Sequence, residues 1–142
     1  MQLSEHFSLQ ELTRSETALR KGLDNTPPPD IIANLTELAL ALEKVREVLG
    51  HPIHINSAYR SPKVNSAVGG SKNSAHMQGY AADITCEGYG TPREVCHAIM
   101  DSTIDYDQVI SEYDAWCHFS IAPTMRRMAL TIDRTGTHSG IA

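Results

Sequence analysis

The chain has 142 residues, of which 41% are apolar and 20% charged, and these values fit one globular domain with a substantial core. The formal net charge of −5 argues against a nucleic-acid-binding protein, because no stripe of Lys and Arg is available to neutralise phosphates. No apolar stretch has the length of a membrane-spanning helix, so we expect no stable membrane association.

The first half of the chain is predicted to be mainly helical. Residues 1–26 form an N-terminal helical segment, with Ser8 as a helix N-cap and Glu11 at the capping-box position. Three consecutive prolines interrupt this segment, and Asp30 can cap the helix that follows. In that helix the apolar residues recur every three or four positions until Gly50 ends it: Ile31, Leu35, Leu38, Leu42, Val45 and Leu49. We expect it to be a core helix without a catalytic role.

The second half is predicted to supply most of a sheet. Apolar and β-branched residues between turn-forming residues indicate five short strands, at 52–57, 81–85, 107–112, 115–121 and 128–132. A tight turn at 113–114 joins the third and fourth strands, and 60–63 and 69–74 are expected to be loops. Helices first and a small, mostly antiparallel sheet later indicate an α+β fold. We expect a single domain over 1–133 and a loose polar tail over 134–142.

One further helix is predicted between the strands at 81–85 and 107–112. Thr91 is its expected N-cap, Pro92 occupies the first helical position, and Glu94 is placed to complete a capping box. The helix would pack its apolar face against the sheet.

Two segments carry residues that can bind a metal. The first runs Ser74-Ala-His76-Met-Gln-Gly79-Tyr-Ala81-Ala-Asp83, and the second is Trp116-Cys-His118. Alternation along the two strands places Asp83 and His118 on polar strand faces, opposite the apolar ones. Two imidazoles and one carboxylate make a three-ligand zinc site with its fourth position open, as catalytic zinc requires. We therefore predict that Zn²⁺ binds to His76, Asp83 and His118, and that the other histidines are ordinary surface or core side chains: His6, His51, His54, His97 and His138.

A zinc hydrolase also needs a general base for its water. Glu112 ends the strand before His118, and a tight hairpin can bring its carboxylate back across from that histidine. Asp114 is closer in sequence, but aspartates in turns are more often local hydrogen-bond acceptors. We favour Glu112 and keep Asp114 as the alternative.

The sequence also offers candidates for contact with a substrate. Arg60 can bind a carboxylate or a developing oxyanion through two parallel hydrogen bonds, and its alternative role is a loop-stabilising salt bridge. Ser74 can donate to substrate or fix the loop before His76. Trp116 is assigned to the substrate-binding surface beside His118.

These motifs resemble the zinc D-Ala-D-Ala carboxypeptidase / L-Ala-D-Glu endopeptidase family of peptidoglycan peptidases, which includes small phage endolysins. The matching stretches are Ser-x-Tyr-Arg at 57–60, Ser-x-His-x-x-Gly-x-Ala-x-Asp at 74–83 and Trp-x-His at 116–118. Around them, Phe7-Ser-Leu-x-Glu-Leu-Thr, Gly69-Gly-Ser and Asp107-Gln-Val-Ile-x-Glu112 resemble the short, phage-type branch.

The resemblance implies an α+β fold shared with the Hedgehog signalling domain, and one zinc held by His, Asp and His. By resemblance the zinc ligands fall on His76, Asp83 and His118, and a substrate-binding arginine falls on Arg60. One departure concerns the base. Several members place the catalytic acid three residues before the last histidine, where this chain has Ala115.

From this resemblance we expect a zinc metallopeptidase that hydrolyses a bond in the peptidoglycan stem peptide, as a phage or prophage lysis enzyme. Which stem-peptide bond is cut stays open between the carboxypeptidase and the endopeptidase reaction. The alternatives are a zinc-containing binding module without turnover and a metal-free interaction protein. The N-terminus lacks the basic and apolar regions of a signal peptide. We therefore expect synthesis in the cytoplasm, action on the cell wall, and a membrane-permeabilising partner for export.

Overall fold

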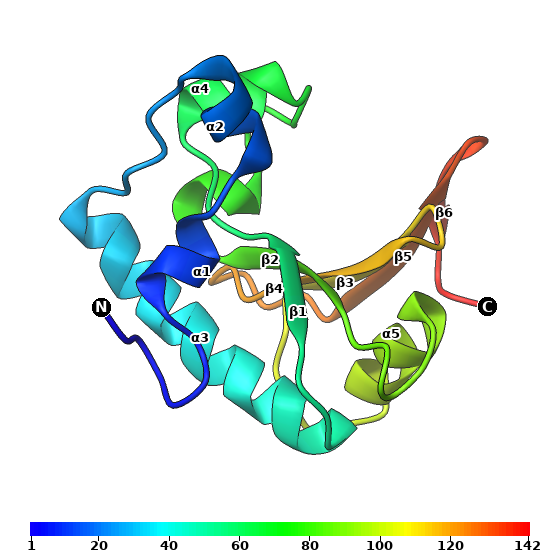
Figure 1. Ribbon diagram of the computed structural model, residues 1–142. Helices are drawn as coiled ribbons and strands as arrows, with labels where there is room; N and C mark the ends of the chain where they lie inside the picture. The colour runs from blue at the N-terminus through cyan, green and yellow to red at the C-terminus, as the bar shows by residue number, and fades with distance from the viewer.

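A six-stranded sheet in the order β1-β2-β4-β3-β5-β6 forms the centre of the computed structural model, which describes residues 1–142 (Figure 1). Its strands are β1 (His54–Ser57), β2 (Ala81–Thr85), β3 (Gln108–Glu112), β4 (Trp116–Ser120), β5 (Met128–Asp133) and β6 (Gly136–Ser139). All neighbouring strands are antiparallel except β3 and β5, which are parallel. The helices are α1 (Leu9–Thr13), α2 (Glu16–Lys21), α3 (Pro29–Leu49), α4 (Pro62–Ala67), the 3₁₀ helix η1 (Ala75–Gln78) and α5 (Pro92–Met100). The predicted α+β fold is confirmed.

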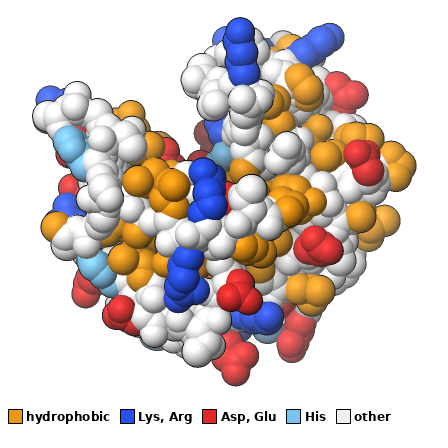
Figure 2. Space-filling view, turned by 180° about the vertical axis from the view of Figure 1, so that it is seen from behind, with side chains coloured by type: hydrophobic (Ala, Val, Ile, Leu, Met, Phe, Trp, Pro, Cys, Tyr) orange, Lys and Arg blue, Asp and Glu red, His pale blue; other side chains and the backbone are white.

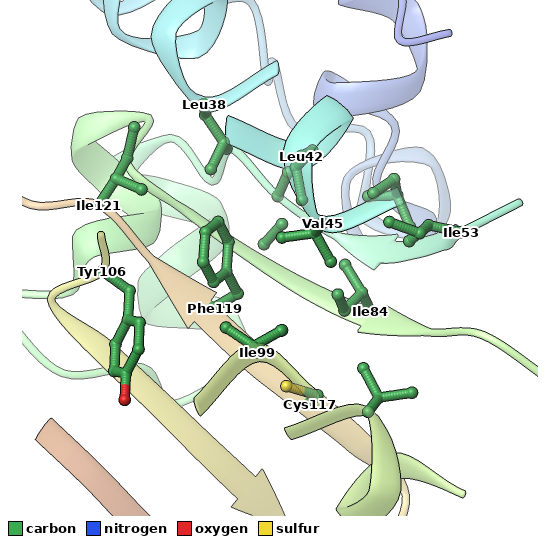
Figure 3. Close-up of a cluster of buried hydrophobic side chains, with 14 of the residues drawn as sticks. Leu38, Leu42, Val45, Ile53, Ile84, Ile99, Tyr106, Cys117, Phe119 and Ile121 are labelled. Carbon is green, nitrogen blue, oxygen red and sulfur yellow. The ribbon is translucent and has the colours of Figure 1, made fainter. Parts of the chain in front are cut away.

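The two faces of the sheet have different surroundings. The long helix α3 and the short helix α5 cover one face (Figure 1), and the core fills the space between them and the sheet. Figure 3 shows Leu38, Leu42 and Val45 of α3 above Phe119 and Ile84 of the sheet. The opposite face is open, with α2, α4 and η1 on one side of it and the β5–β6 hairpin on the other (Figure 1).

Side-chain alternation along β2 and β4 separates the core from the open face. Ala82 and Ile84 of β2 and Phe119 of β4 are fully buried in the core cluster. Asp83 and His118 point to the other side of the sheet, and the register pairs them directly across from each other. Residues paired in this way project from the same face, so the register alone brings one carboxylate and one imidazole together.

The local signals of the two longer helices are confirmed. Gly50 ends α3 in the left-handed conformation, with φ of 69°. Thr91 and Glu94 form the reciprocal hydrogen bonds of a capping box at the start of α5. No helix has the length and apolar character needed to cross a bilayer.

Three local expectations are corrected. The N-terminal segment 1–26 contains two helices, α1 and α2, because the chain is extended between them and Ser15 caps the second. Asp30 lies inside the first turn of α3 and does not cap it, since the helix already begins at Pro29. Its charge there complements the helix dipole. Part of the loop expected at 60–63 begins α4, because Ser61 caps that helix and Pro62 fits its first position.

The C-terminal residues differ from the loose tail expected over 134–142. Strand β6 pairs with β5 from Asp133 opposite Gly136 to Leu130 opposite Ser139. The hydroxyl group of Thr131 donates to the carbonyl oxygen of Gly140 at 2.7 Å. Ile141 is buried at the margin of the core. The polar composition of this stretch therefore reflects an exposed edge hairpin, which the sheet holds by backbone pairing.

Candidate metal centre and active-site cleft

Three buried side chains from three elements converge on the open face of the sheet. His76, Asp83 and His118 each offer a ligand atom, and these atoms all lie within 4.8 Å of one another. Nε2 of His76 is 3.3 Å and Nδ1 of His118 is 3.0 Å from Oδ1 of Asp83. The structure thus brings together the three residues that the sequence predicted as metal ligands.

The turn that holds His76 depends on a serine and a glycine. Oγ of Ser74 accepts a hydrogen bond from the backbone N–H of His76 at 3.2 Å and so begins η1. Gly79 ends η1 with φ of +78°, in the left-handed region that glycine tolerates. A Cβ atom at Gly79 would also lie 3.1 Å from Ile31 and 3.2 Å from Leu35 of α3. The motif therefore needs glycine both for the turn and for the close approach of α3.

A backbone contact fixes which nitrogen of His76 faces the other ligands. Nδ1 of His76 lies 2.7 Å from the carbonyl oxygen of Ala58. Because a carbonyl oxygen can only accept, Nδ1 carries the proton and Nε2 keeps its lone pair for a metal. Metal-binding histidines are commonly oriented by such a hydrogen bond. Together with one carboxylate and a second imidazole, this donor set fits Zn²⁺.

The charge of Asp83 is stabilised by the two imidazoles. Burial by itself raises the pKa of this carboxyl group, but the charges that His76 and His118 carry when protonated, and the hydrogen bonds that they make, outweigh it. The resulting pKa of Asp83 lies well below its usual value. The carboxylate is therefore ionised at neutral pH, as a metal ligand must be.

Glu112 stands beside the metal centre. It pairs with Trp116 across the β3–β4 hairpin, and Nε1 of Trp116 donates to its Oε2 at 3.0 Å. The same oxygen lies 3.8 Å from Nδ1 of His118. The hairpin closes tightly because Tyr113 and Asp114 both adopt positive φ, at 56° and 53°, in the three-residue turn 113–115 between the strands. The predicted return of Glu112 towards His118 is what the structure shows.

Asp114 does not reach this centre. Its side chain is 69% exposed and forms a surface ion pair with Arg93 at 2.8 Å, whereas the side chain of Glu112 is 19% exposed and lines the cleft. Of the two carboxylates considered as a base, the structure places only Glu112 near the metal ligands.

Arg60 also lines the cleft around the centre. Its backbone N–H donates to the carbonyl oxygen of His76 at 3.1 Å, and its Nη2 donates to Oγ of Ser74 at 3.3 Å. Its Nε is buried without a hydrogen-bond partner. Burial lowers the pKa of Arg60, while the negative charges of Asp83 and Glu112 act in the opposite direction. The loop-stabilising salt bridge considered for Arg60 is absent, and the residue lines the cleft.

The centre lies in a cleft of about 890 Å³, which we call the main cleft. Figure 2 shows the surface hollowed between the protruding β5–β6 hairpin and the lobe formed by α4 and the loop after it. The sequence did not single out the wall formed by this loop. Nδ2 of Asn65 donates to the carbonyl oxygen of Ser71, and a Cβ atom at Gly70 would overlap the side chain of Asn65. The Gly69-Gly70 pair was the available signal for such a close approach.

The far end of the main cleft is held by a second group that sequence reasoning missed. Asp107 is buried, and its carboxylate accepts two hydrogen bonds from the guanidinium of Arg126, at 2.9 and 2.8 Å. The hydroxyl group of Thr124 donates to the same carboxylate at 2.8 Å. This network fixes the segment between β4 and β5 where it borders the cleft.

Comparison with known proteins agrees with this geometry. The family model described as peptidase M15 matches residues 5–120. The chain belongs to the peptidase M15 family. This M15 chain is also 41% identical over 59 residues to the zinc D-Ala-D-Ala carboxypeptidase of Streptomyces albus G, a match that covers 41% of the chain. The match spans 23% of the length of that relative. The predicted family is thereby confirmed, and the His-Asp-His donor set fits the zinc in the name of that relative.

Proposed function

We propose that the chain is a zinc metallopeptidase that hydrolyses a peptide bond in the stem peptide of peptidoglycan, either as a D-Ala-D-Ala carboxypeptidase or as an L-Ala-D-Glu endopeptidase. The observation that carries the proposal is the arrangement of His76, Asp83 and His118 around one point, with Glu112 beside it in a cleft. The similarity to the zinc D-Ala-D-Ala carboxypeptidase of Streptomyces albus G supports this substrate class.

In the proposed site, His76, Asp83 and His118 would hold the zinc ion. When bound, Zn²⁺ supplies a Lewis acid that lowers the pKa of a water ligand towards about 7 and polarises the carbonyl group under attack. The contact of His76 with Ala58 and the direct pairing of Asp83 with His118 keep these donors in place. Side chains of the protein carry out the proton transfer and bind the substrate.

Glu112 is the proposed general base and acid. Its carboxylate takes the proton of the attacking water as the new C–O bond forms, and it returns that proton to the leaving amine as the C–N bond breaks. Trp116 donates to Oε2 and so fixes the orientation of the carboxylate. A base that is held in this way loses little orientational freedom when the substrate binds.

Arg60 is the proposed cation of the site. Its guanidinium can donate to a substrate carboxylate or to the oxygen that becomes negative during attack. Ser74 accepts from Nη2 of Arg60 and from the backbone of His76, so that one hydroxyl group links the cation to a metal ligand. We assign Ser74 a positioning role and Trp116 a place in the substrate-binding wall.

The cellular role that we propose for this activity is that of a phage or prophage lysis enzyme. Such a protein is made in the cytoplasm and acts on the cell wall, so it needs a partner that opens the membrane. This part of the proposal rests on the phage-type motifs around the metal-binding residues.

The decisive experiment incubates zinc-loaded protein with purified peptidoglycan and identifies the released ends by mass spectrometry. We expect new ends that appear with zinc and disappear when a chelator is added. The matched control is His118→Ala. This substitution removes one proposed ligand from the open face of the sheet, outside the hydrophobic core, and should leave the fold intact. Zinc bound at one ion per chain without any released ends would contradict the proposal and favour a binding module without turnover.

A further inference from the structure

The hollow around the metal centre continues on both sides of it. Beyond the main cleft lies a second cleft of about 500 Å³, between α2 and β1, which we call the α2–β1 cleft. The two clefts share four lining residues: Arg60, Val68, Asp83 and Trp116. One of these is a metal ligand and two flank the centre. Asp83 therefore stands at the junction of the two clefts, while His76 and His118 line the main cleft alone.

The α2–β1 cleft has one wall from the sheet. In β1 the residues alternate, so that Ile55 enters the core while His54 and Asn56 are exposed on the open face. The register places His54 opposite Thr85 and Ser57 opposite Asp83. The open face that holds Asp83 thus extends onto the edge strand β1, where an irregularity between Ile55 and Ser57 shifts the register by one residue.

The other wall comes from the start of α2 and is polar. It includes Arg14, Glu16 and Thr17, and the two charged side chains are exposed. Charges of both signs and neutral hydrogen-bonding groups therefore surround this cleft. Such a lining suits an extended peptide that carries both carboxylate and amine groups.

The position of Arg60 bears on which peptide bonds can be cut. An exopeptidase that reads a terminal carboxylate needs its cation at the closed end of a pocket. Here Arg60 lines both clefts and so stands between them. We propose that the site is an endopeptidase site, in which substrate residues on the two sides of the scissile bond occupy the main cleft and the α2–β1 cleft. This inference rests on the proposed function and narrows it to cleavage inside a peptide chain.

The first test compares two synthetic stem pentapeptides that share an acetylated amino terminus. One ends in a free carboxylate and the other in an amide. We expect zinc-loaded protein to cut both at the same internal bond, with kcat/KM values within about threefold of each other, because binding does not depend on one terminal charge. Release of the last residue from the free acid alone would overturn the endopeptidase assignment but leave the proposed peptidase function standing. Failure to cut either peptide or peptidoglycan would overturn both.

The second test fills the α2–β1 cleft from each wall separately. Asn56→Trp and Thr17→Trp should lower kcat/KM for the amidated peptide by about tenfold or more, since the substrate can no longer lie in its productive position. Leu40→Trp, on the exposed side of α3, introduces the same side chain far from the cleft and should leave the value unchanged. Equal activity of all three variants would overturn the assignment of this cleft.

Binding gives a readout that does not depend on turnover. Calorimetric titration of the amidated peptide into metal-free protein should show weaker binding to Asn56→Trp than to Leu40→Trp. Equal affinities would mean that the peptide does not enter the α2–β1 cleft.

Discussion

Glu112 and Asp114 stand two positions apart in one hairpin, yet only Glu112 faces the metal centre, 3.8 Å from His118. Asp114 lies at the turn and pairs with Arg93 on the surface. We therefore expect Glu112→Gln to lower kcat by about 10²- to 10⁴-fold, because the amide cannot accept the proton of the attacking water. Zinc stoichiometry, measured by metal analysis, should stay unchanged. Asp114→Asn is the matched control and should retain activity within about twofold, as expected for an exposed ion pair. The reverse pattern would make Asp114 the base.

Asp107 illustrates a residue whose role is stability. Hydrogen bonds from Arg126, which outweigh the effect of burial, hold the pKa of Asp107 well below its usual value. A carboxyl group with a lowered folded-state pKa stabilises the protein fully above the unfolded-state value near about 3.9 and loses that contribution as the pH falls through the folded-state pKa. We expect Asp107→Asn to lower the free energy of unfolding by about 1–2 kcal/mol at pH 7. Urea unfolding at several pH values should show that the difference in free energy of unfolding between Asp107→Asn and the natural chain becomes smaller below about pH 4. A difference that is constant with pH would contradict this origin.

At the scale of single elements, the ends of the helices carry strong local signals. The capping box of α5 joins Thr91 and Glu94 through hydrogen bonds of 3.2 and 3.0 Å. Thr91→Ala leaves a backbone N–H of the first turn without its partner and should cost about 1 kcal/mol of stability. Thr103→Ala removes an exposed threonine hydroxyl outside any cap and should cost much less. Urea unfolding measures the free energy of unfolding of both variants. Equal losses of stability in Thr91→Ala and Thr103→Ala would show that the cap does not stabilise the helix.

At the scale of the whole molecule, the proposed zinc site would join three elements, because its three candidate ligands come from η1, β2 and β4. A ligand that binds only the folded chain stabilises it, by about 2.7 kcal/mol when its concentration is 100 times Kd. We therefore expect added Zn²⁺ to raise the Tm of chelator-treated protein by several degrees in a thermal unfolding experiment. His118→Ala should abolish most of this increase. An increase of the same size in that variant would show that zinc stabilises the fold from some other place.

Local rules that act over a few residues determined much of this fold from the sequence alone. The spacing of apolar residues defined α3, Thr91 and Pro92 located the start of α5, and alternation assigned Asp83 to the face opposite the core. These features could be predicted from the sequence because each depends on residues two to four positions away. The motif around His76 was readable for a similar reason, since its serine and glycine are needed by the turn itself.

Only the tertiary structure decided the features that depend on contacts between distant segments. The position of Glu112 beside His118, and of Asp114 on the surface, depends on which side of a tight hairpin each carboxylate faces. The pairing of β6 with β5 and the splitting of the N-terminal segment also lay beyond local rules, because an edge hairpin and an extended linker have similar polar composition. The α2–β1 cleft beside Arg60 forms where residues of α2, β1 and β4 meet. Sequence periodicity assigns a residue to a face of its own element, whereas a cleft is formed by how several such faces pack, and that is fixed only when the chain has folded.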